Sequence, residues 1–140
     1  MTPTTDELLA KVPLFKDLSK KHLQKISGIA TSIDADAGKV LTREGETGHE
    51  FIIILEGEVE VRRGDEVIAT RRAGDYIGEI SLIEHQPRTA TVIATTHVVI
   101  EVIAQREFAA LLATEPDIAE QIRATSDQRR QELGDAAEER

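Results

Sequence analysis

The hydrophobic residues of this chain follow two different periods, and the change between them divides the sequence into three parts. Between residues 20 and 30, apolar residues recur at the spacing of one helix face, at Leu23, Ile26 and Ile29. From residue 31 to residue 103 they form short runs or alternate with polar residues, as in strands. Helical spacing then returns. We therefore predict one domain over 1–140, with N-terminal helices at 1–30, strands at 31–103 and C-terminal helices at 105–133.

The predicted strands are short and are separated by turns that contain glycine. The apolar run at 51–55 indicates a strand buried on both faces, whereas 58–62 alternates strictly and indicates one solvent-facing side. Gly64-Asp65 is a hairpin signal before a returning strand at 66–70. Strands at this close spacing predict a mainly β fold with flanking helices, an antiparallel β-barrel or jelly roll. The other predicted strands are 40–42, 91–94 and 98–103.

The N-terminal helices are predicted from their capping residues. A short helix at 6–12 follows the possible caps Thr4 and Thr5, and Pro13 ends it. Ser19 is the predicted cap of the helix at 20–30.

The C-terminal helices are predicted at 105–113 and from Pro116 to about residue 133, with Pro116 in the first turn and Gly134 as the stop. The last helix is apolar at Ile118 and Ile122 but mostly polar afterwards. Its second half therefore cannot bury much apolar surface, which is what a mobile lid requires.

Composition narrows the choice of environment and partner. Aromatic residues make up only 3% of the 140 residues, so the core must be aliphatic, and the absence of cysteine excludes disulfides and cysteine-bound metals. No apolar run approaches the ~20 residues of a membrane helix, and the acidic N-terminus is not a secretory signal. The net charge of −9 disfavours nucleic acid as a partner. A cytoplasmic protein is expected.

Residues 78–92 carry the clearest binding chemistry. Gly78 lets a ligand approach the backbone, and the amides that open the following short apolar run suit an anion. Arg88 supplies a guanidinium that can fork onto phosphate oxygens, and Thr89 supplies a hydroxyl. Glu79 would repel a phosphate but can accept a hydrogen bond from a sugar hydroxyl. A phosphate and a ribose hydroxyl in one compact site indicate a nucleotide.

The segments Gly78-Glu79-Ile80-Ser81-Leu82 and Pro87-Arg88-Thr89-Ala90-Thr91-Val92 resemble the phosphate-binding cassette of cyclic nucleotide-binding domains. The resemblance implies that Glu79 binds the ribose 2′-hydroxyl and that Arg88 binds the cyclic phosphate. The chain departs from the family at Ile77, where Phe is frequent, and at Ser81, where Ala is frequent. The predicted nucleotide-binding residues are Gly78, Glu79, Ile80, Ser81, Arg88, Thr89 and Ala90, with Val61 from a strand and Arg129 from the last helix.

The last helix resembles the lid helix of bacterial cyclic nucleotide-gated potassium channel domains. This resemblance implies that Arg129, on one helical stripe with Ile118, Ile122 and Thr125, covers the base. In the family, Thr at the position of Thr89 often accompanies better cGMP binding, but the lid favours cAMP as the ligand, with cGMP possible. The expected function is a regulatory sensor whose effector lies on another chain.

Two alternatives remain open at this stage. The first is an interaction domain of the same fold that binds no nucleotide. The second is a cupin-like enzyme, which would share a similar barrel but would need metal ligands. The histidines are scattered and match no metal-binding spacing, so we expect no metal, no cofactor and no enzymatic activity. They are His22, His49, His85 and His97.

Overall fold

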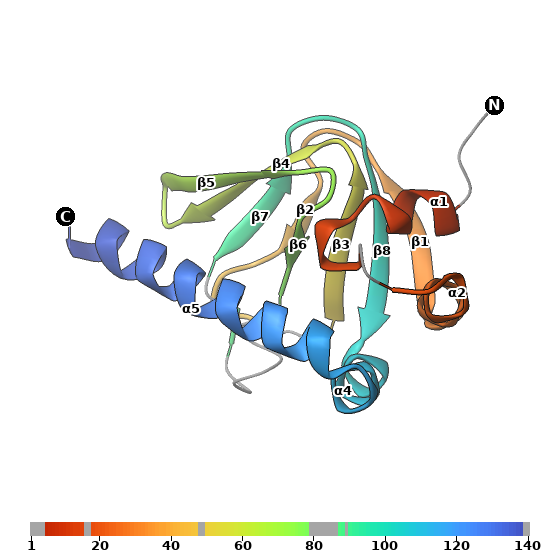
Figure 1. The fold of residues 1–140 in the computed structure, drawn as a ribbon. Helices are drawn as coiled ribbons and strands as arrows, with labels where there is room; N and C mark the ends of the chain where they lie inside the picture. Colours follow the sequence, from red (N-terminus) through yellow and green to blue (C-terminus); the bar gives the residue numbers. More distant parts are fainter. Residues whose placement is uncertain (1–4, 16–17, 48–49, 79–86, 89, 139–140) are drawn as a thin grey trace.

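Two four-stranded antiparallel sheets form the centre of the molecule, and the helices pack mainly on one of them (Figure 1). The computed structural model describes residues 5–15, 18–47, 50–78, 87–88 and 90–138. The elements are α1 (Thr5–Ala10), η1 (Pro13–Phe15), α2 (Lys20–Ile29), β1 (Ala30–Ala35), β2 (Val40–Thr42), β3 (Glu50–Glu56), β4 (Glu58–Arg63), β5 (Glu66–Arg72), β6 (Tyr76–Ile77), β7 (Thr91–Ala94), β8 (Val98–Ala104), α4 (Gln105–Thr114) and α5 (Pro116–Glu138).

The strand order confirms the predicted fold class, mainly β with flanking helices. One sheet has the order β1-β8-β3-β6 and the other has the order β2-β7-β4-β5. The hairpin predicted at Gly64-Asp65 joins β4 to β5, since Arg63 pairs with Glu66 across it. Gly64 has φ 62°, a conformation that suits glycine in a tight turn.

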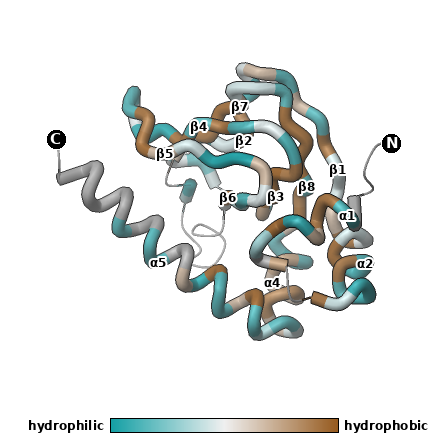
Figure 2. Tube along the Cα trace, turned by 45° about the horizontal axis from the view of Figure 1, so that its top comes forward, coloured by the Kyte–Doolittle hydropathy of each residue, from teal (hydrophilic) through white to brown (hydrophobic). Residues whose placement is uncertain are grey.

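Strand β3 lies between the two hydrophobic cores. Its residues 51–55 are all buried, as the continuous apolar run predicted. Phe51, Ile53 and Leu55 contribute to the core under the helices, and Ile52 and Ile54 contribute to the core between the sheets. Alternate residues of a strand face opposite sides, so this strand connects both cores. Figure 2 shows the apolar character concentrated along β3 and β8.

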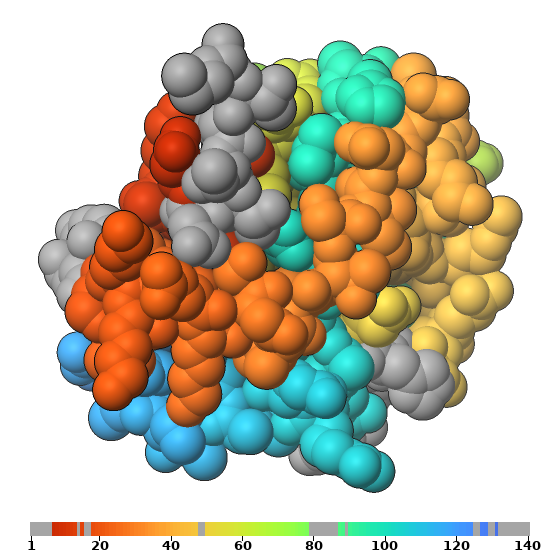
Figure 3. All heavy atoms as spheres, turned by 90° about the vertical axis from the view of Figure 1, so that its right-hand side faces the viewer, coloured from red at the N-terminus to blue at the C-terminus, as the bar shows by residue number. Residues whose placement is uncertain are grey.

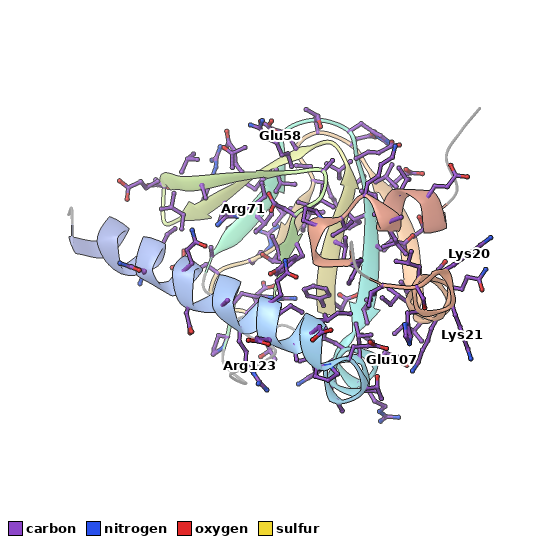
Figure 4. The ribbon with its side chains drawn as sticks, in the orientation of Figure 1. Lys20, Lys21, Glu58, Arg71, Glu107 and Arg123 are labelled. Carbon is purple, nitrogen blue, oxygen red and sulfur yellow. The ribbon has the colours of Figure 1, made fainter. Side chains whose placement is uncertain are left out.

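The helices bury the face of the β1-β8-β3-β6 sheet that points away from the second sheet. Ser19 caps α2 as predicted, because its side chain accepts a hydrogen bond from the His22 amide. Lys20 and Lys21 project from α2 into solvent (Figure 4). The Phe51 and Phe108 rings stack with centroids 4.4 Å apart, which places α4 against β3.

The first turns of α5 are anchored and the rest of the helix extends past the strands (Figure 1). Ile118 and Ile122 are buried, as expected. The prediction that Gly134 ends the helix is wrong because α5 continues to Glu138. A single glycine costs a helix only about 1 kcal/mol relative to alanine, which does not end it. None of the helices in the described part of the chain is long and apolar enough to cross a membrane.

Strands β1 and β6 were not predicted from the sequence. The burial pattern of β1 shows mostly exposed residues, so it has no apolar run and no clean alternation. It is nevertheless paired with β8 along its whole length. Strand β6 has only two residues, which is below the length at which a period can be recognised.

Glu101 is a charged residue on β8 inside an apolar layer. It is 1% exposed, and neither carboxyl oxygen has a hydrogen-bond partner among the described residues. Burial raises the pKa of the Glu101 carboxyl. The hydroxyl of Ser32, its partner in the β1–β8 register, partly offsets that shift from a position that does not meet hydrogen-bond geometry. The ionised side chain therefore destabilises the folded protein.

Replacing Glu101 with Gln is expected to stabilise the protein in a pH-dependent manner. Below the ordinary pKa of glutamate, ~4.3, both states of the wild type are protonated and the two proteins should match. As pH rises through the higher folded pKa, the wild type must charge a buried group. At about pH 8 Glu101→Gln should increase the free energy of unfolding by about 1–3 kcal/mol in urea titrations.

Glu56→Gln is the matched control, because Glu56 is an exposed glutamate on β3. This substitution should change the free energy of unfolding by less than about 0.5 kcal/mol at either pH. A Glu101→Gln protein less stable than wild type at pH 8 would contradict the assignment of Glu101 as a buried, unfavourable charge.

Candidate functional site

Gly78 begins the predicted cassette directly after β6. That strand pairs Ile77 with Ile52 of β3, so the end of β6 is fixed against the sheet. Gly78 has φ 93°, which disfavours any residue with a Cβ. A Cβ here would collide with the guanidinium of Arg88 and would lie 2.8 Å from the carbonyl oxygen of Glu50. The absence of a side chain therefore lets Arg88 lie against the backbone at Gly78.

Arg88 is held at both its backbone and its side chain. Its amide donates to the carbonyl of Glu46 at 2.8 Å, and its carbonyl accepts from the amide of Gly45 at 2.9 Å. Its Nη2 donates to the carbonyl of Glu50 at 2.6 Å, a charge-assisted hydrogen bond. Only 8% of Arg88 is exposed. The guanidinium of Arg88, which is predicted to bind the phosphate, is therefore buried and held in a fixed position.

Side-chain hydroxyls tie the end of the cassette to the loop after β2. Thr42 donates from Oγ1 to the Ala90 carbonyl at 3.2 Å, and the Glu44 amide donates to Oγ1 of Thr91 at 3.0 Å. The Glu44 carboxylate in turn accepts from the Gly64 amide at 2.9 Å, which links this loop to the β4–β5 hairpin. The loop after β2, the cassette and the hairpin thus form one connected unit.

Val61 lies on β4 beside the end of the cassette. It is the register partner of Val92 on β7, and Ala69 of β5 lies on its other side. It packs against the core between the sheets and is partly exposed. The structure therefore brings Val61 together with the segment that carries Arg88 and Ala90.

The remaining predicted site residues stay predictions. Glu79, Ile80, Ser81 and Thr89 lie outside the described residues. Arg129 lies on α5, but its side chain, like that of Thr125, is outside the described part of the chain. Arg123, the residue after the anchored Ile122, points away from the barrel (Figure 4).

Within the described residues, no group of three His, Cys, Asp or Glu side chains could bind a metal ion. Two described histidines instead contact carboxylates. His22 lies 3.3 Å from Glu115, and His97 lies 3.5 Å from Asp34 and 3.2 Å from Asp36.

The sequence profile of the cyclic nucleotide-binding domain family matches residues 33–115. This range includes most strands, the cassette and α4. The chain belongs to the cyclic nucleotide-binding domain family.

Curated relatives come from channels and from kinase regulatory subunits. A cyclic nucleotide-gated potassium channel of Rhizobium etli is 38% identical over 89% of this chain and 35% of the channel. A cAMP-dependent protein kinase regulatory subunit of Schizosaccharomyces pombe is 35% identical over 81% of this chain and 28% of that protein. The chain thus spans about a third of the length of these relatives.

Solved structures share the fold over nearly the whole chain. The structure of cAMP-bound PfPKA-R superposes with a TM-score of 0.87 at 26% identity, over 94% of this chain and 46% of that one. The regulatory subunit of a cAMP-independent protein kinase A from Trypanosoma brucei superposes with a TM-score of 0.80 at 27% identity, over 89% of this chain and 46% of that one.

Sequence reasoning missed the residues that position Arg88. Gly45, Glu46 and Glu50 contact it through backbone atoms, which every non-proline residue type carries. Gly45 has φ 85°, a conformation that favours glycine in a turn. No sequence pattern indicated that this turn meets the cassette.

The contact between Gly78 and Arg88 can be tested with two glycine substitutions. Gly38 has φ 94°, almost the same as Gly78, but a Cβ there would meet nothing within 4 Å. Backbone strain should therefore be similar in Gly38→Ala and Gly78→Ala, and only the second adds a collision. Gly78→Ala should lower the free energy of unfolding by about 1–3 kcal/mol more than Gly38→Ala in denaturant titrations. Equal losses would mean that Arg88 does not lie against Gly78.

Proposed function

We propose that this chain is a regulatory sensor domain that binds a cyclic nucleotide, with cAMP preferred and cGMP possible, and that it does not turn the nucleotide over. The observation that carries the proposal is the position of Arg88. Its guanidinium is buried beside a glycine that must lack a side chain, inside the segment that resembles the phosphate-binding cassette. A cyclic phosphate bound at this glycine would meet a guanidinium that is already oriented.

Orientation before binding matters for affinity. The side chain of a free arginine has many rotamers, and ordering it on binding costs about 0.5–1.5 kcal/mol. Here the backbone hydrogen bonds to Glu46 and Gly45, and the side-chain bond to Glu50, have already ordered Arg88. Glu79 is proposed to accept the ribose 2′-hydroxyl, and Thr89 to contact the phosphate and a syn purine.

The comparisons support a sensor role, because the relatives named above are channels and kinase regulatory subunits. By analogy, the proposed partner of this cytoplasmic domain is an effector that reads its conformation. The proposed signal is closure of α5, with Arg129 over the base, where a guanidinium stacked on a purine gains about 0.5–2 kcal/mol.

A domain that binds no cyclic nucleotide is the second candidate. It is favoured by the T. brucei relative, whose kinase is described as cAMP-independent although the fold is shared. Shared fold does not fix the ligand. The two candidates differ in whether the wild-type chain binds cAMP at all.

Isothermal titration calorimetry with cAMP and cGMP tests the proposal. Arg88→Ala should weaken cAMP binding by about 2–5 kcal/mol, because a buried charged contact is lost. Glu79→Ala should cost less, about 1–3 kcal/mol, because it leaves a sugar hydroxyl rather than a charge without its partner. Arg72→Ala is the control, since Arg72 is largely exposed and pairs with Glu58 at 3.5 Å on the surface. It should leave the affinity unchanged.

Two results would count against the proposal in different ways. No heat and no thermal shift at millimolar cAMP or cGMP would favour the interaction domain. If Glu79→Ala weakened binding more than Arg88→Ala, the chain would still be a nucleotide-binding domain, but the roles assigned to these two residues would be wrong. Circular dichroism of each variant should first establish that the barrel is folded.

Closure of α5 predicts a localised change in hydrogen exchange. The anchored residues Ile118 and Ile122 are buried without ligand, so amides near them should be protected with or without cAMP. Amides from 125 to 133 should become protected when cAMP is added, because a ligand that prefers the closed state shifts the population toward it. Protection that is equal with and without cAMP at 125–133 would exclude α5 as the lid.

A further inference from the structure

The two sheets are open to each other along one side, between β1 and β2. Each of these strands is the edge of its sheet, and within the described strands β1 pairs with β8 and β2 pairs with β7. Figure 3 shows this side, with the orange atoms of β1 next to the lighter orange and yellow atoms of β2 and the start of β3. We call the opening between these two strands the seam.

A cavity of about 430 Å³ lies in the seam. Its volume is within the range of about 300–1,000 Å³ that is usual for small-molecule sites. Its inner wall is apolar, because Ile52, Ile100 and Val102 of the core between the sheets line it. None of the described cassette residues, 78, 87–88 and 90–92, lines it. The described lining of the cavity is therefore distinct from the described part of the proposed nucleotide site.

Apolar residues of both edge strands, β1 and β2, line the cavity. Ile33 of β1 lines it and is 42% exposed, although its register partner Ile100 is buried. On β2, the neighbours Val40 and Leu41 both line the cavity, whereas neighbours in a regular strand face opposite sides. The register shift between Val40 and Thr42 accounts for this, because a bulge redirects a side chain.

The charges at the cavity select the class of ligand. Asp34, Asp36 and Glu50 line it, and Lys39 is the lining residue of opposite charge. His97 contacts Asp36 at 3.2 Å and Asp34 at 3.5 Å from the neighbouring loop. The hydrogen bond to Asp36 raises the pKa of the His97 imidazole, desolvation opposes the shift, and Asp34 adds to it. Among the described residues, three carboxylates against Lys39 and a protonated His97 still leave one negative charge.

We propose that the seam cavity is a binding site for a small amphiphilic cation, with a hydrocarbon or aromatic body against Ile33, Ile52 and Ile100 and an ammonium group at Asp34 and Glu50. The apolar body would cover the exposed part of Ile33, and the ammonium group would be attracted by the excess of carboxylates at the cavity. This inference does not depend on nucleotide binding.

Three probes of the same shape test it: 3-phenylpropylamine, 3-phenylpropanol and 3-phenylpropanoate. The measurement is a titration of the full chain carrying ¹³C-labelled isoleucine δ-methyl groups, at low salt and without nucleotide. The amine should shift the signals of Ile33, Ile52 and Ile100 at the lowest concentration, the alcohol should bind more weakly and the carboxylate most weakly. Glu50→Gln should reduce the preference for the amine over the alcohol.

A matched pair of variants tests the position of the site. Ile33 and Val67 are both exposed aliphatic residues on strands, at 42% and 48%, but Val67 lies on β5 and does not line the cavity. Ile33→Ser should weaken amine binding by about three- to tenfold, and Val67→Ser should leave it unchanged.

Three results would overturn the proposal: no shift of the three isoleucine signals with any probe at about 10 mM, a carboxylate or alcohol that binds as well as the amine, or equal effects of Ile33→Ser and Val67→Ser. The probe series uses the wild-type chain, so it decides the question even if a variant does not fold. Failure of the chain to bind cAMP would not change the interpretation of these titrations, because they contain no nucleotide.

Discussion

The structure depends on a strand that has no polar face. Strand β3 sends Phe51, Ile53 and Leu55 toward the helices and Ile52 and Ile54 into the space between the sheets. Neither core is complete without it, so helices and barrel are joined through one buried strand. The position of Arg88 follows from this arrangement, because Glu50, whose carbonyl receives the guanidinium, is the first residue of β3. The candidate site is thus attached to a strand that contributes to both cores.

The site is organised by backbone groups as much as by side chains. Arg88 is fixed by carbonyls and an amide from the loop after β2 and the start of β3. Thr42, Glu44 and Thr91 connect the same loop to the cassette and to the β4–β5 hairpin. The backbone hydrogen bonds to Arg88 survive most substitutions in the loop, whereas the bonds that use the side chains of Thr42, Glu44 and Thr91 depend on those residues. In this frame Gly78 and Arg88 are the described cassette residues whose side chains, absent or charged, form the candidate phosphate site.

The sequence was most informative where a physical pattern is local. The run at 51–55, the hairpin at Gly64-Asp65 and the Ser19 cap each need only neighbouring residues, and all three are confirmed. The family was correctly inferred because the cassette is one continuous segment. The features that could not be predicted from the sequence depend on contacts between segments that are far apart in the chain. Strand β1 is polar and exists because β8 lies beside it, and the partners of Arg88 act through backbone atoms that no residue type encodes.

Glu50 contributes both to the candidate nucleotide site and to the seam cavity. Its backbone carbonyl accepts a hydrogen bond from Arg88, and the residue also lines the seam cavity, where its carboxylate is proposed to bind an ammonium group. A carbonyl is present whatever residue occupies the position, so the cassette places little demand on the identity of residue 50. The residue type at position 50 is therefore constrained mainly by the seam cavity. Among relatives, substitutions at residue 50 should therefore accompany substitutions in β1 and β2 rather than substitutions in the cassette. Sequence variation at this one residue would then report on the seam cavity and not on the nucleotide site.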